Sequence, residues 1–223
     1  MNSDLNLRIS PRTVQQETIE KLRMAIIGGA FAPGSHLVES QLCTKLGVSR
    51  PSLREALRSL EAERLIEIIP NRGPFVPKLS WDEATAIYDV RELLEVEAAG
   101  RCATLITDSQ LLDLERSLNA FEAAQQSDDR LARVTMAAEF FAIIVANCGN
   151  AIIEEVHRGL VARISFFRGQ SMSLQGRAAK SMVEMRELYQ AIAARDEKAA
   201  RAAAKWHLEK AKAAAREAME QEG

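Results

Sequence analysis

The sequence predicts a mainly α-helical protein, in which three helices and a short β-hairpin precede an all-helical antiparallel bundle of about six helices. Aromatic residues make up only 5% of the chain and alanine is abundant, which favours closely packed helices over sheets. All six prolines lie at or before Pro77. The proline-free remainder therefore fits a run of long helices.

The chain divides near Pro77–Ser80 into two predicted domains, residues 1–79 and 80–223. The first holds 11 Lys and Arg against 8 Asp and Glu, whereas the second holds 18 against 23. A basic segment attached to an acidic body suggests contact with nucleic acid at one end. Ser80 and Glu83 have the spacing of a capping box, which predicts that a helix starts at the boundary.

Turn residues separate the elements of the first domain. Gly28 and Gly29 end one helix, Gly47 is typical of a left-handed helix cap, and Ser49 is a candidate N-cap for the next helix. The predicted helices cover residues 13–27, 39–46 and 50–63, and the predicted strands cover 65–69 and 75–76. Three helices followed by a hairpin describe a winged helix-turn-helix.

The third predicted helix has two distinct faces. At about 100° per residue, an apolar stripe and a basic face separate, formed by Leu53, Ala56, Leu57 and Leu60 and by Arg50, Arg54 and Arg58. An arginine can donate two hydrogen bonds to guanine, each good pair contributing about 1–3 kcal/mol of discrimination. A solvated face paired with Glu55 and Glu61 is the alternative. The adjoining short helix and hairpin favour binding to double-stranded DNA.

Four segments of this domain resemble the DNA-binding domain of GntR-family bacterial transcription factors: Phe31–Gly34, Leu37–Glu39, Leu46–Leu57 and Pro70–Gly73. The resemblance implies a homodimer that grips a short palindromic operator and is released or remodelled by a small ligand. A repressor is expected.

The same resemblance assigns DNA-contacting roles. It implies that Arg50 and Arg54 contact bases and phosphates, assisted by Ser49 and Ser52. Arg72 and Gly73 would form the wing tip. The family commonly has glycine where this chain has Arg64, which would contact a phosphate or remain a solvated cation.

The second domain resembles the FCD-type effector domain of the FadR subfamily, in the segments Ile87–Glu95, Gly149–Asn150, Ala191–Asp196 and His207–Leu208. Many such domains hold a divalent metal with one Asp and three His. Aligned on Gly149–Asn150, these positions hold Ala137, Phe141, Met185 and His207. Only the last can bind a metal, so we expect no metal and no other cofactor. Glu139 lies about 200° from Ala137 on its helix and is expected to point away, and Glu184 lies about 100° from Met185, so we expect neither to replace a lost ligand. A different metal site, built from His207 with Cys102 or Cys148, is the alternative.

The replaced positions predict either an apolar effector cavity or a filled core. Phe141, Met185 and His207 are the candidate effector residues there. Arg91 lies on an apolar stripe, where a guanidinium needs an anionic partner. Glu95, one turn further on, is one such partner. The carboxylate of a small organic-acid effector is the other, because arginine binds carboxylates with two hydrogen bonds. Arg163 is predicted as a second anchor.

The sequence lacks the motifs that several classes of enzyme need. The sequence contains no Walker motif, no His-Glu-x-x-His and no Gly-x-Ser-x-Gly, so we predict that the chain is not an enzyme. A di-metal enzyme would need two Glu-x-x-His pairs, and only Glu154–His157 has this spacing. An architectural DNA-binding dimer that senses nothing remains an alternative.

The sequence also lacks the segments that direct a chain to a membrane. No apolar stretch approaches the roughly 18 residues of a membrane span, and the first residues lack an apolar signal core. We therefore expect a cytoplasmic protein that has no membrane partner and is associated with the nucleoid when bound to its operator.

Overall fold

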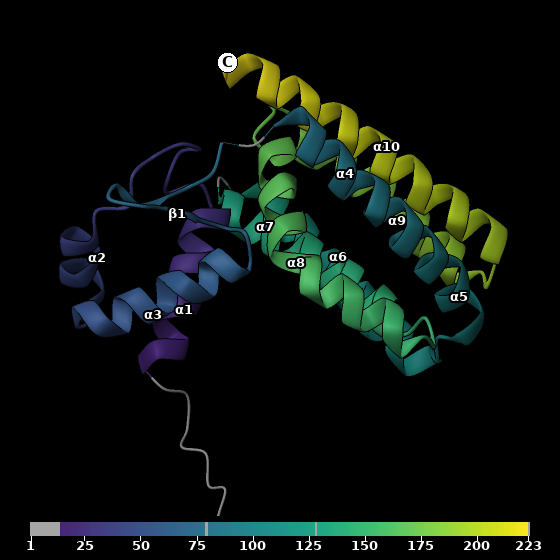
Figure 1. Cartoon of the computed structure of the whole chain (residues 1–223). Coiled ribbons are helices and arrows are strands. Elements are labelled where there is room, and N and C mark those ends of the chain that lie inside the picture. Colours follow the sequence, from purple (N-terminus) through teal and green to yellow (C-terminus); the bar gives the residue numbers. More distant parts are fainter. Residues whose placement is uncertain (1–13, 79, 128, 223) are drawn as a thin grey trace, which may run out of the picture.

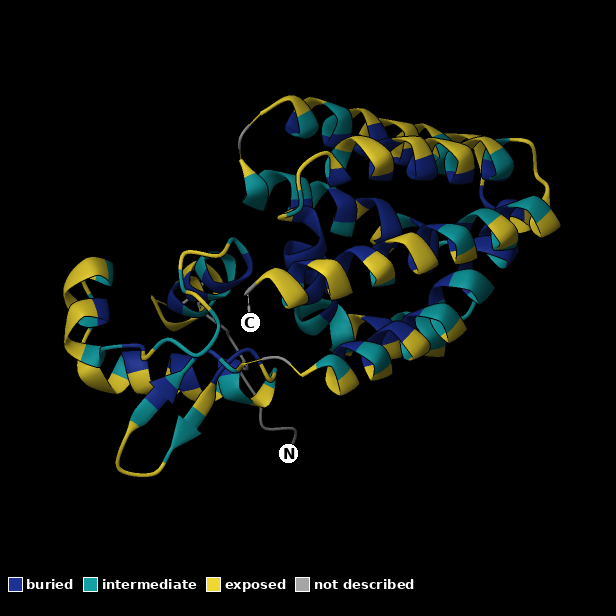
Figure 2. Cartoon of the chain, turned by 90° about the horizontal axis from the view of Figure 1, so that it is seen from above, coloured by how far each residue is buried: buried dark blue, intermediate teal, exposed yellow. Residues whose placement is uncertain are grey.

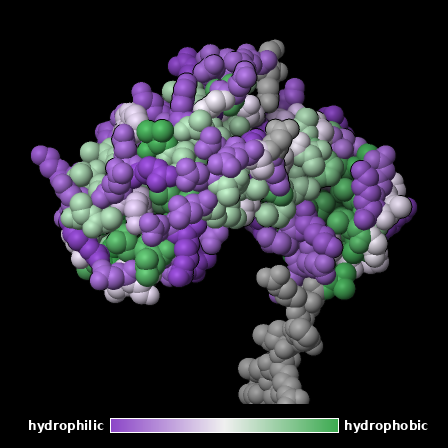
Figure 3. Space-filling view, turned by 180° about the vertical axis from the view of Figure 1, so that it is seen from behind, coloured by the Kyte–Doolittle hydropathy of each residue, from purple (hydrophilic) through white to green (hydrophobic). Residues whose placement is uncertain are grey.

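The computed structural model describes residues 14–78, 80–127 and 129–222, which form a smaller N-terminal lobe and a larger helical lobe (Figure 1). Thr13, the first residue of a predicted helix, and Leu79, at the predicted domain boundary, lie outside the described residues. Seen from behind, the two lobes flank a hollow, and much of the visible surface is hydrophilic (Figure 3).

The N-terminal lobe is a winged helix-turn-helix, as predicted. Its elements are α1 (Val14–Ile27), α2 (Glu39–Leu46), α3 (Arg50–Ala62), β1 (Glu67–Ile69) and β2 (Gly73–Phe75). The two strands pair antiparallel, with Glu67 opposite Phe75. Apolar side chains from all three helices, including Leu22, Leu42 and Leu57, form its buried core.

The strand bounds differ from the prediction: β1 begins at Glu67 and not at residue 65, and β2 covers Gly73–Phe75 and not residues 75–76. Leu65 and Ile66 precede β1 and are buried in the core of the lobe. After β2, the N–H of Val76 donates to the carbonyl of Ser35, 3.0 Å away. The ladder with β1 therefore ends at Phe75, because the next residue pairs with the loop that precedes α2.

The C-terminal lobe is an all-helical bundle. A continuous helix formed by α4 (Trp81–Arg91), the π-helix η1 (Glu92–Val96) and α5 (Glu97–Leu105) is followed by α6 (Asp108–Gln126), α7 (Arg130–Ala146), α8 (Ala151–Met172), α9 (Arg177–Ala193) and α10 (Glu197–Glu222). Counting α4–η1–α5 as one, the described part of this lobe has six helices, as predicted. The capping box at Ser80 is present, since its hydroxyl accepts from the N–H of Glu83 and the Glu83 carboxylate accepts from the N–H of Ser80.

Helix α10 lies along α9 and also contacts α4, α5 and α8 (Figure 1). Buried residues follow the inner sides of the bundle helices, and exposed residues the outer sides (Figure 2). The main core of the bundle combines small side chains such as Ala98 and Ala204 with large ones such as Phe121 and Phe140. Small residues let the helices approach closely, while the aromatic side chains fill the space between them.

The two lobes share their hydrophobic cores. Phe166 of α8 packs in the core of the N-terminal lobe, and Ile27 of α1 packs in the core of the bundle. The close approach of α8 to α1 favours glycine at position 169, because a Cβ there would lie 3.0 Å from the Ile27 carbonyl oxygen. Helix α8 therefore links the two lobes, and α7 also contacts α1.

None of the helices in the described part of the chain has the length and apolar character needed to span a membrane.

Candidate functional site

The start of α3 is held rigidly by its cap. Gly47 adopts the left-handed conformation that ends α2, with φ 67° and ψ 33°. Ser49 is the N-cap of α3, and its hydroxyl accepts from the N–H of Ser52 over 3.4 Å. The two hydroxyl groups lie 2.9 Å apart, so both serines, which were expected to assist at the DNA, also shape the beginning of this helix.

The two faces of α3 differ in burial as the periodicity predicts. Leu53, Ala56, Leu57 and Leu60 are at most 2% exposed. The three arginines of the opposite face, Arg50, Arg54 and Arg58, are exposed. The apolar side of α3 is thus packed in the core of the lobe, and the three guanidinium groups are accessible to a polyanion from solvent.

Two of these arginines are paired with acidic residues. Arg54 Nε donates to Glu39 Oε2 over 3.1 Å, and Arg58 Nη1 to Glu55 Oε1 over 2.9 Å. Arg50 makes no ion pair or hydrogen bond with any described side chain. Glu61, considered as another partner, instead accepts from the N–H of Ile68. Such exposed pairs are weak and can open when a stronger anion approaches.

The wing tip is a tight turn between β1 and β2. Pro70 precedes Asn71, whose φ is 62°, and the N–H of Arg72 donates to the carbonyl of Ile69 over 3.0 Å. This is the pattern of a type II turn. Gly73 follows with φ 89°, a conformation that favours glycine. The Arg72 guanidinium is exposed and lies 5.0 Å from the centre of the Phe75 ring.

Arg64 occupies a backbone position that suits glycine. Its φ is 60°, in the left-handed region, which explains why the resembling family commonly has glycine in this stretch. The side chain is exposed and lines a pocket of about 650 Å³ between the lobes.

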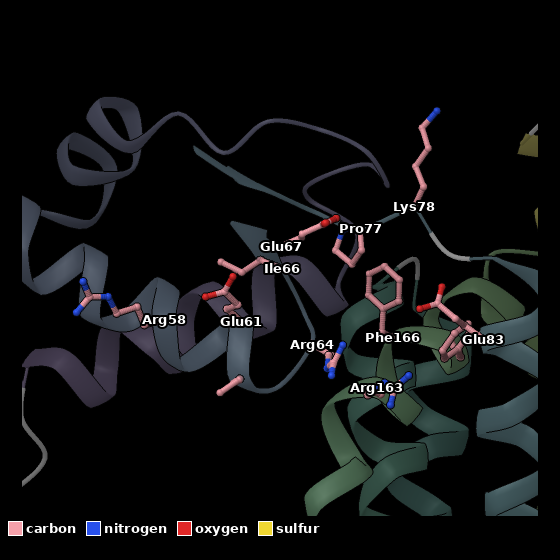
Figure 4. A pocket seen from close by; sticks show the side chains of 12 residues that line it. Arg58, Glu61, Arg64, Ile66, Glu67, Pro77, Lys78, Glu83, Arg163 and Phe166 are labelled. Atoms are coloured by element: carbon pink, nitrogen blue, oxygen red, sulfur yellow. The ribbon is translucent and has the colours of Figure 1, made fainter. Parts of the chain in front are cut away.

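The same pocket contains Arg163, which corrects one expectation. Predicted as a second effector anchor beside Arg91 in the bundle, Arg163 is half-buried at the interlobe pocket, near Arg64, Lys78 and Phe166 (Figure 4). A side chain at this angle on α8 faces the winged lobe, because α8 packs against α1 on that side.

Arg91 has a protein partner. Its Nε and Nη2 donate to the two carboxylate oxygens of Glu95, over 2.8 and 3.2 Å, and both residues are 1% exposed. Burial opposes ionisation of Glu95, but the charge and the hydrogen bonds of Arg91 outweigh it, so the pKa of Glu95 lies well below its usual range. His157 Nε2 lies 3.5 Å from Glu95 Oε1. Glu95 lies in η1, and such π-helical turns are frequent at functional sites. Arg91 keeps one unpaired nitrogen, Nη1.

Phe141, Met185 and His207 are all buried in the bundle. The rings of Phe141 and His207 stack with centroids 5.0 Å apart. His207 Nδ1 lies 2.8 Å from Glu184 Oε2. Burial lowers the pKa of His207, although Glu184 acts in the opposite direction, so the imidazole is neutral at pH 7. A neutral His207 can donate its Nδ1 proton to the carboxylate.

The side chain of Glu184 reaches into the bundle interior although it lies about 100° from Met185 on the helix. Glu184 is 3% exposed and accepts from Arg177 Nη1 and Nη2 over 2.6 and 2.7 Å. His207 of α10 and Arg177, at the start of α9, both contact Glu184. The side of α9 that carries Glu184 is therefore buried as well as the side that carries Met185.

These residues do not fit the metal of the resembling domains. The one retained ligand, His207, has an arginine–glutamate pair on one side and the Phe141 ring on another. Within the described ranges, no group of three or more His, Cys, Asp or Glu side chains could hold a metal ion. A buried guanidinium in this position would also repel a cation.

Arg168 and Arg177 of this region were not predicted from the sequence, and Glu184 was considered only as a substitute metal ligand. Arg168 is 4% exposed, and its guanidinium carbon lies 5.4 Å from the centre of the Phe141 ring. The sequence carries one signal for Arg168. The spacing of His157, Ile164 and Arg168 places the three side chains on one face of α8, so the charged residue shares its face with an apolar one.

Family comparisons agree with both lobes. Residues 14–76 match the family described as bacterial regulatory proteins of the gntR family, and residues 86–210 match the FCD domain. The chain therefore belongs to the GntR family of regulatory proteins, with a GntR-type DNA-binding domain and a C-terminal FCD domain.

Curated relatives include the HTH-type transcriptional repressor RspR of Escherichia coli K12, 35% identical over 119 residues, 52% of each chain. The chain thus spans about half the length of this relative. The galactonate operon transcriptional repressor of the same strain is 28% identical over 200 residues, covering 80% of this chain and 86% of the other. The family and these relatives carry names of transcriptional regulators, not of enzymes.

Solved structures share the fold. The Escherichia coli protein McbR/YncC superposes with a TM-score of 0.77 at 21% identity, covering 89% of this chain and 95% of the other. A protein described as a GntR transcriptional regulator from Rhodococcus sp. RHA1 gives a TM-score of 0.74 at 27% identity, with the same coverage.

Proposed function

We propose that the chain is a transcriptional repressor that binds a short palindromic DNA operator as a homodimer, and that a small organic acid bound in the C-terminal bundle changes this affinity. The observation that carries the proposal is the exposed face of Arg50, Arg54 and Arg58 on a helix whose opposite side is buried. An α-helix with this distribution fits the major groove.

The wing complements this helix. Arg72 projects from a rigid two-stranded hairpin and can contact the minor groove or backbone beside the recognition helix. Contact with DNA would replace Glu39 as the partner of Arg54 and Glu55 as the partner of Arg58. Arg54 and Arg58 would then exchange weak ion pairs at the surface for contacts with bases and phosphates.

Exposed apolar side chains of the bundle support the dimer. Leu93 is 74% exposed, Ile152 65% and Val156 45%. They lie on η1 and on the first half of α8, two segments joined where His157 Nε2 comes within 3.5 Å of Glu95 Oε1. A twofold contact through this surface would present two copies of α3 to the two halves of a palindrome.

The names of two relatives support an organic-acid effector. One is the galactonate operon repressor, and another, 33% identical over 109 residues and covering 49% of this chain and 44% of the other, is the gluconate operon repressor of Bacillus licheniformis. Galactonate and gluconate are carboxylates, in agreement with the arginine-rich interior of this bundle. The absence of a metal remains part of this proposal, and stoichiometric zinc or nickel in the purified protein would contradict it.

A second candidate function is a DNA-binding dimer that has no effector. Phe141 and Met185 favour it, because they are 1% and 0% exposed and belong to the main core. A filled core of this kind would leave the bundle only a dimerising role.

Helix α8 supplies a route from effector to DNA. It places Phe166 in the winged lobe and His157 and Arg168 in the bundle. A ligand that favours one position of α8 over another would bias the orientation of α1 and therefore of the DNA-binding lobe.

Selection from random duplex DNA, followed by binding measurements at one fixed salt concentration, tests the DNA-binding function. Arg54→Ala is expected to weaken binding to the selected site about 10- to 100-fold, and to weaken binding to unrelated DNA much less. Arg116→Ala, an exposed arginine of α6, is the matched charge control and should leave both nearly unchanged. Equal losses on both DNAs would make Arg54 a phosphate contact, and failure to select any site would contradict the function.

A further inference from the structure

A pocket of about 650 Å³ lies between the two lobes (Figure 4). Its walls come from the end of α3, the segments that flank the hairpin, the first turn of α4 and the second half of α8. Phe141, Met185 and His207 are not among its lining residues, so the pocket is separate from the interior of the bundle. Its volume lies in the range of about 300–1,000 Å³ that is usual for sites of small ligands.

One wall of this interlobe pocket is apolar. Phe166 of α8 and Ile66 of the winged lobe line it, and both are buried in the core of that lobe. Pro77 lies beside the Phe166 ring (Figure 4). Side chains of a packed core keep their positions, so this wall can receive the organic part of a ligand without rearrangement.

Two guanidinium groups, one from each lobe, line the same pocket. Arg64 lies between α3 and β1 and is exposed, whereas Arg163 lies on α8 and is half-buried. Among residues 14–78, 80–127 and 129–222, neither guanidinium donates a hydrogen bond or forms an ion pair with a carboxylate. Two like charges at one pocket repel each other, and an anion bound between them would remove this repulsion.

The acidic residues of the pocket do not neutralise these two arginines. Glu61 Oε1 accepts from the N–H of Ile68 over 3.1 Å. Glu83 Oε2 accepts from the N–H and the hydroxyl of Ser80, over 3.2 and 3.0 Å. The third, Glu67, is exposed and points toward the Pro77 side of the pocket in Figure 4. Two of the three carboxylates are therefore engaged in contacts within the protein.

Two further cations belong to the rim. Arg58 is paired with Glu55, which lies outside the pocket. Lys78 is exposed and extends away from Arg64 in Figure 4. With these residues, four cationic side chains of the pocket stand against three acidic ones. The rim therefore attracts anions, and the two unpaired arginines remain to bind them.

The backbone at Arg64 gives a second reason to assign this side chain a ligand. Its φ of 60° lies in the left-handed region, which residues with a side chain rarely adopt and which costs free energy. Strain of this kind is concentrated at sites that bind ligands or perform chemistry. No hydrogen bond or ion pair of the Arg64 guanidinium with the described residues offsets the strain, whereas contact with an anion would.

We propose that the interlobe pocket binds a small phosphate monoester, whose phosphate group bridges Arg64 of the winged lobe and Arg163 of α8. A phosphate group has three acceptor oxygens and a charge close to two, so it can accept from two guanidinium groups that approach from different sides. A carboxylate has one plane of two oxygens and matches a single guanidinium. The organic part of the ester packs against Ile66 and Phe166.

Such a ligand would act on the relative position of the lobes. Because it contacts both Arg64 and Arg163, it favours the arrangement of the lobes in which these two side chains share one pocket. This site is independent of the organic acid proposed for the bundle and of the contacts of α3 with DNA.

The test uses full-length protein and measures thermal unfolding and calorimetric binding at constant ionic strength. The probes are glucose phosphorylated at its primary hydroxyl, adenosine monophosphate and sodium phosphate, with glucose, adenosine and sodium gluconate as the matched compounds without phosphate. At least one of the two esters should bind and raise the unfolding temperature, and its unphosphorylated form should not. The ester that binds distinguishes a sugar phosphate from a nucleotide. No response to any of the three phosphates would overturn the site.

Variants locate the bound phosphate. Arg64→Gly and Arg163→Met should each weaken ester binding at least about tenfold, and Arg163→Lys should restore part of the affinity. Arg158→Met, which changes an exposed arginine of α8 paired with Glu154, is the matched control and should bind like the wild type. Unchanged binding by either Arg64→Gly or Arg163→Met would overturn the bridge between the lobes. Gluconate binding that both variants lose would overturn the ligand class.

Measurements without ligand exclude other roles of the two arginines. The unfolding temperatures of Arg64→Gly and Arg163→Met should not fall below that of the wild type, and a marked fall in both would assign the arginines to the structure instead. Their affinity for DNA, at fixed salt and without ester, should equal that of the wild type. A loss would make the arginines contacts of the DNA backbone and overturn the site. Failure of the wild type to bind DNA would contradict the repressor function and leave the phosphate site standing.

Discussion

Arginines occupy two contrasting environments in this protein. On α3 they stand in solvent, and two of them form single hydrogen bonds with neighbouring carboxylates. In the interior of the bundle, Arg91, Arg168 and Arg177 are at most 4% exposed, and the first and last of these hold a carboxylate with two nitrogens of the guanidinium. The surface arginines can exchange partners easily, whereas Arg91 and Arg177 are each committed to a buried glutamate of their own helix.

The contrast shows what burial does to the same chemical group. Exposed pairs are screened by water and contribute little to stability, so they leave α3 ready for DNA. Buried pairs become indispensable once formed, because removal of one partner leaves an unsolvated charge. Arg168 combines the two conditions, since it is buried like the second set and unpaired with any acid in the described chain.

The largest expected effect comes from breaking a buried pair. Glu184→Gln removes the charge that Arg177 and His207 share, and should lower the free energy of unfolding by about 3–5 kcal/mol. Urea unfolding measures it. Glu55→Gln, which breaks the exposed pair with Arg58, should change stability by less than about 1 kcal/mol. Equal effects of the two changes would remove the distinction between the regions.

The second effect is a pH dependence from His207. Its pKa is lowered in the folded protein, chiefly by burial and further by the charges of Arg177 and Arg91, while Glu184 opposes the shift. The unfolded chain therefore takes up the proton first, and stability is lost as the pH falls below the ordinary histidine value near 6.5. The slope should approach about 1.4 kcal/mol per pH unit until the folded pKa is reached.

Unfolding measured between pH 7.5 and 5 checks this dependence. His207→Gln should make the curve flatter in that window, because the variant has no imidazole to protonate there. A variant as steep as the wild type would show that other groups cause the acid destabilisation.

A third, smaller effect concerns the backbone of the DNA-binding lobe. Arg64→Gly should stabilise the protein by about 0.5–1 kcal/mol, since φ 60° is strained for arginine and free for glycine. Thermal unfolding measures the change. Arg158→Gly, within α8, should have the opposite sign, because glycine lowers helix stability by about 1 kcal/mol. Destabilisation by Arg64→Gly would mean that the side chain contributes more in its pocket than the backbone strain costs.

The smallest expected effect is on DNA binding, and it tests whether the exposed arginines of α3 exchange partners easily. Glu39→Gln frees Arg54 from its carboxylate partner and should tighten operator binding about two- to fivefold, the size of a surface ion pair. Fluorescence anisotropy at fixed salt measures it. Glu122→Gln breaks an exposed pair with Arg186 in the bundle and provides the control. Similar tightening by both variants would indicate a general charge effect.

Much of the DNA-binding lobe could be predicted because its signals are local. Gly47 and Ser49 mark the ends of neighbouring helices, and the repeat of Leu53, Leu57 and Leu60 determines which face of α3 is buried. The strand lengths were predicted less well. The partner of Val76 is Ser35, 41 residues away along the chain, and no local pattern records it.

The bundle interior was predicted less completely for the same reason. The alternatives for Arg91 included Glu95, since these residues are one helical turn apart. The pairing of Glu184 with His207, and the position of Arg163 at the winged lobe, depend on how α8, α9 and α10 pack. The angle of about 100° between Glu184 and Met185 does not show that a second side of α9 is also buried.

The helices, their caps, the hairpin turn and the basic face of α3 can be read from the chain alone, because each arises from interactions within a few residues. The packing of the helices sets which charges pair inside the bundle, and it leaves Arg168 without an ion pair to any acid of the described residues. Those outcomes depend on contacts between helices far apart in sequence, where burial removes water and makes each missing partner count.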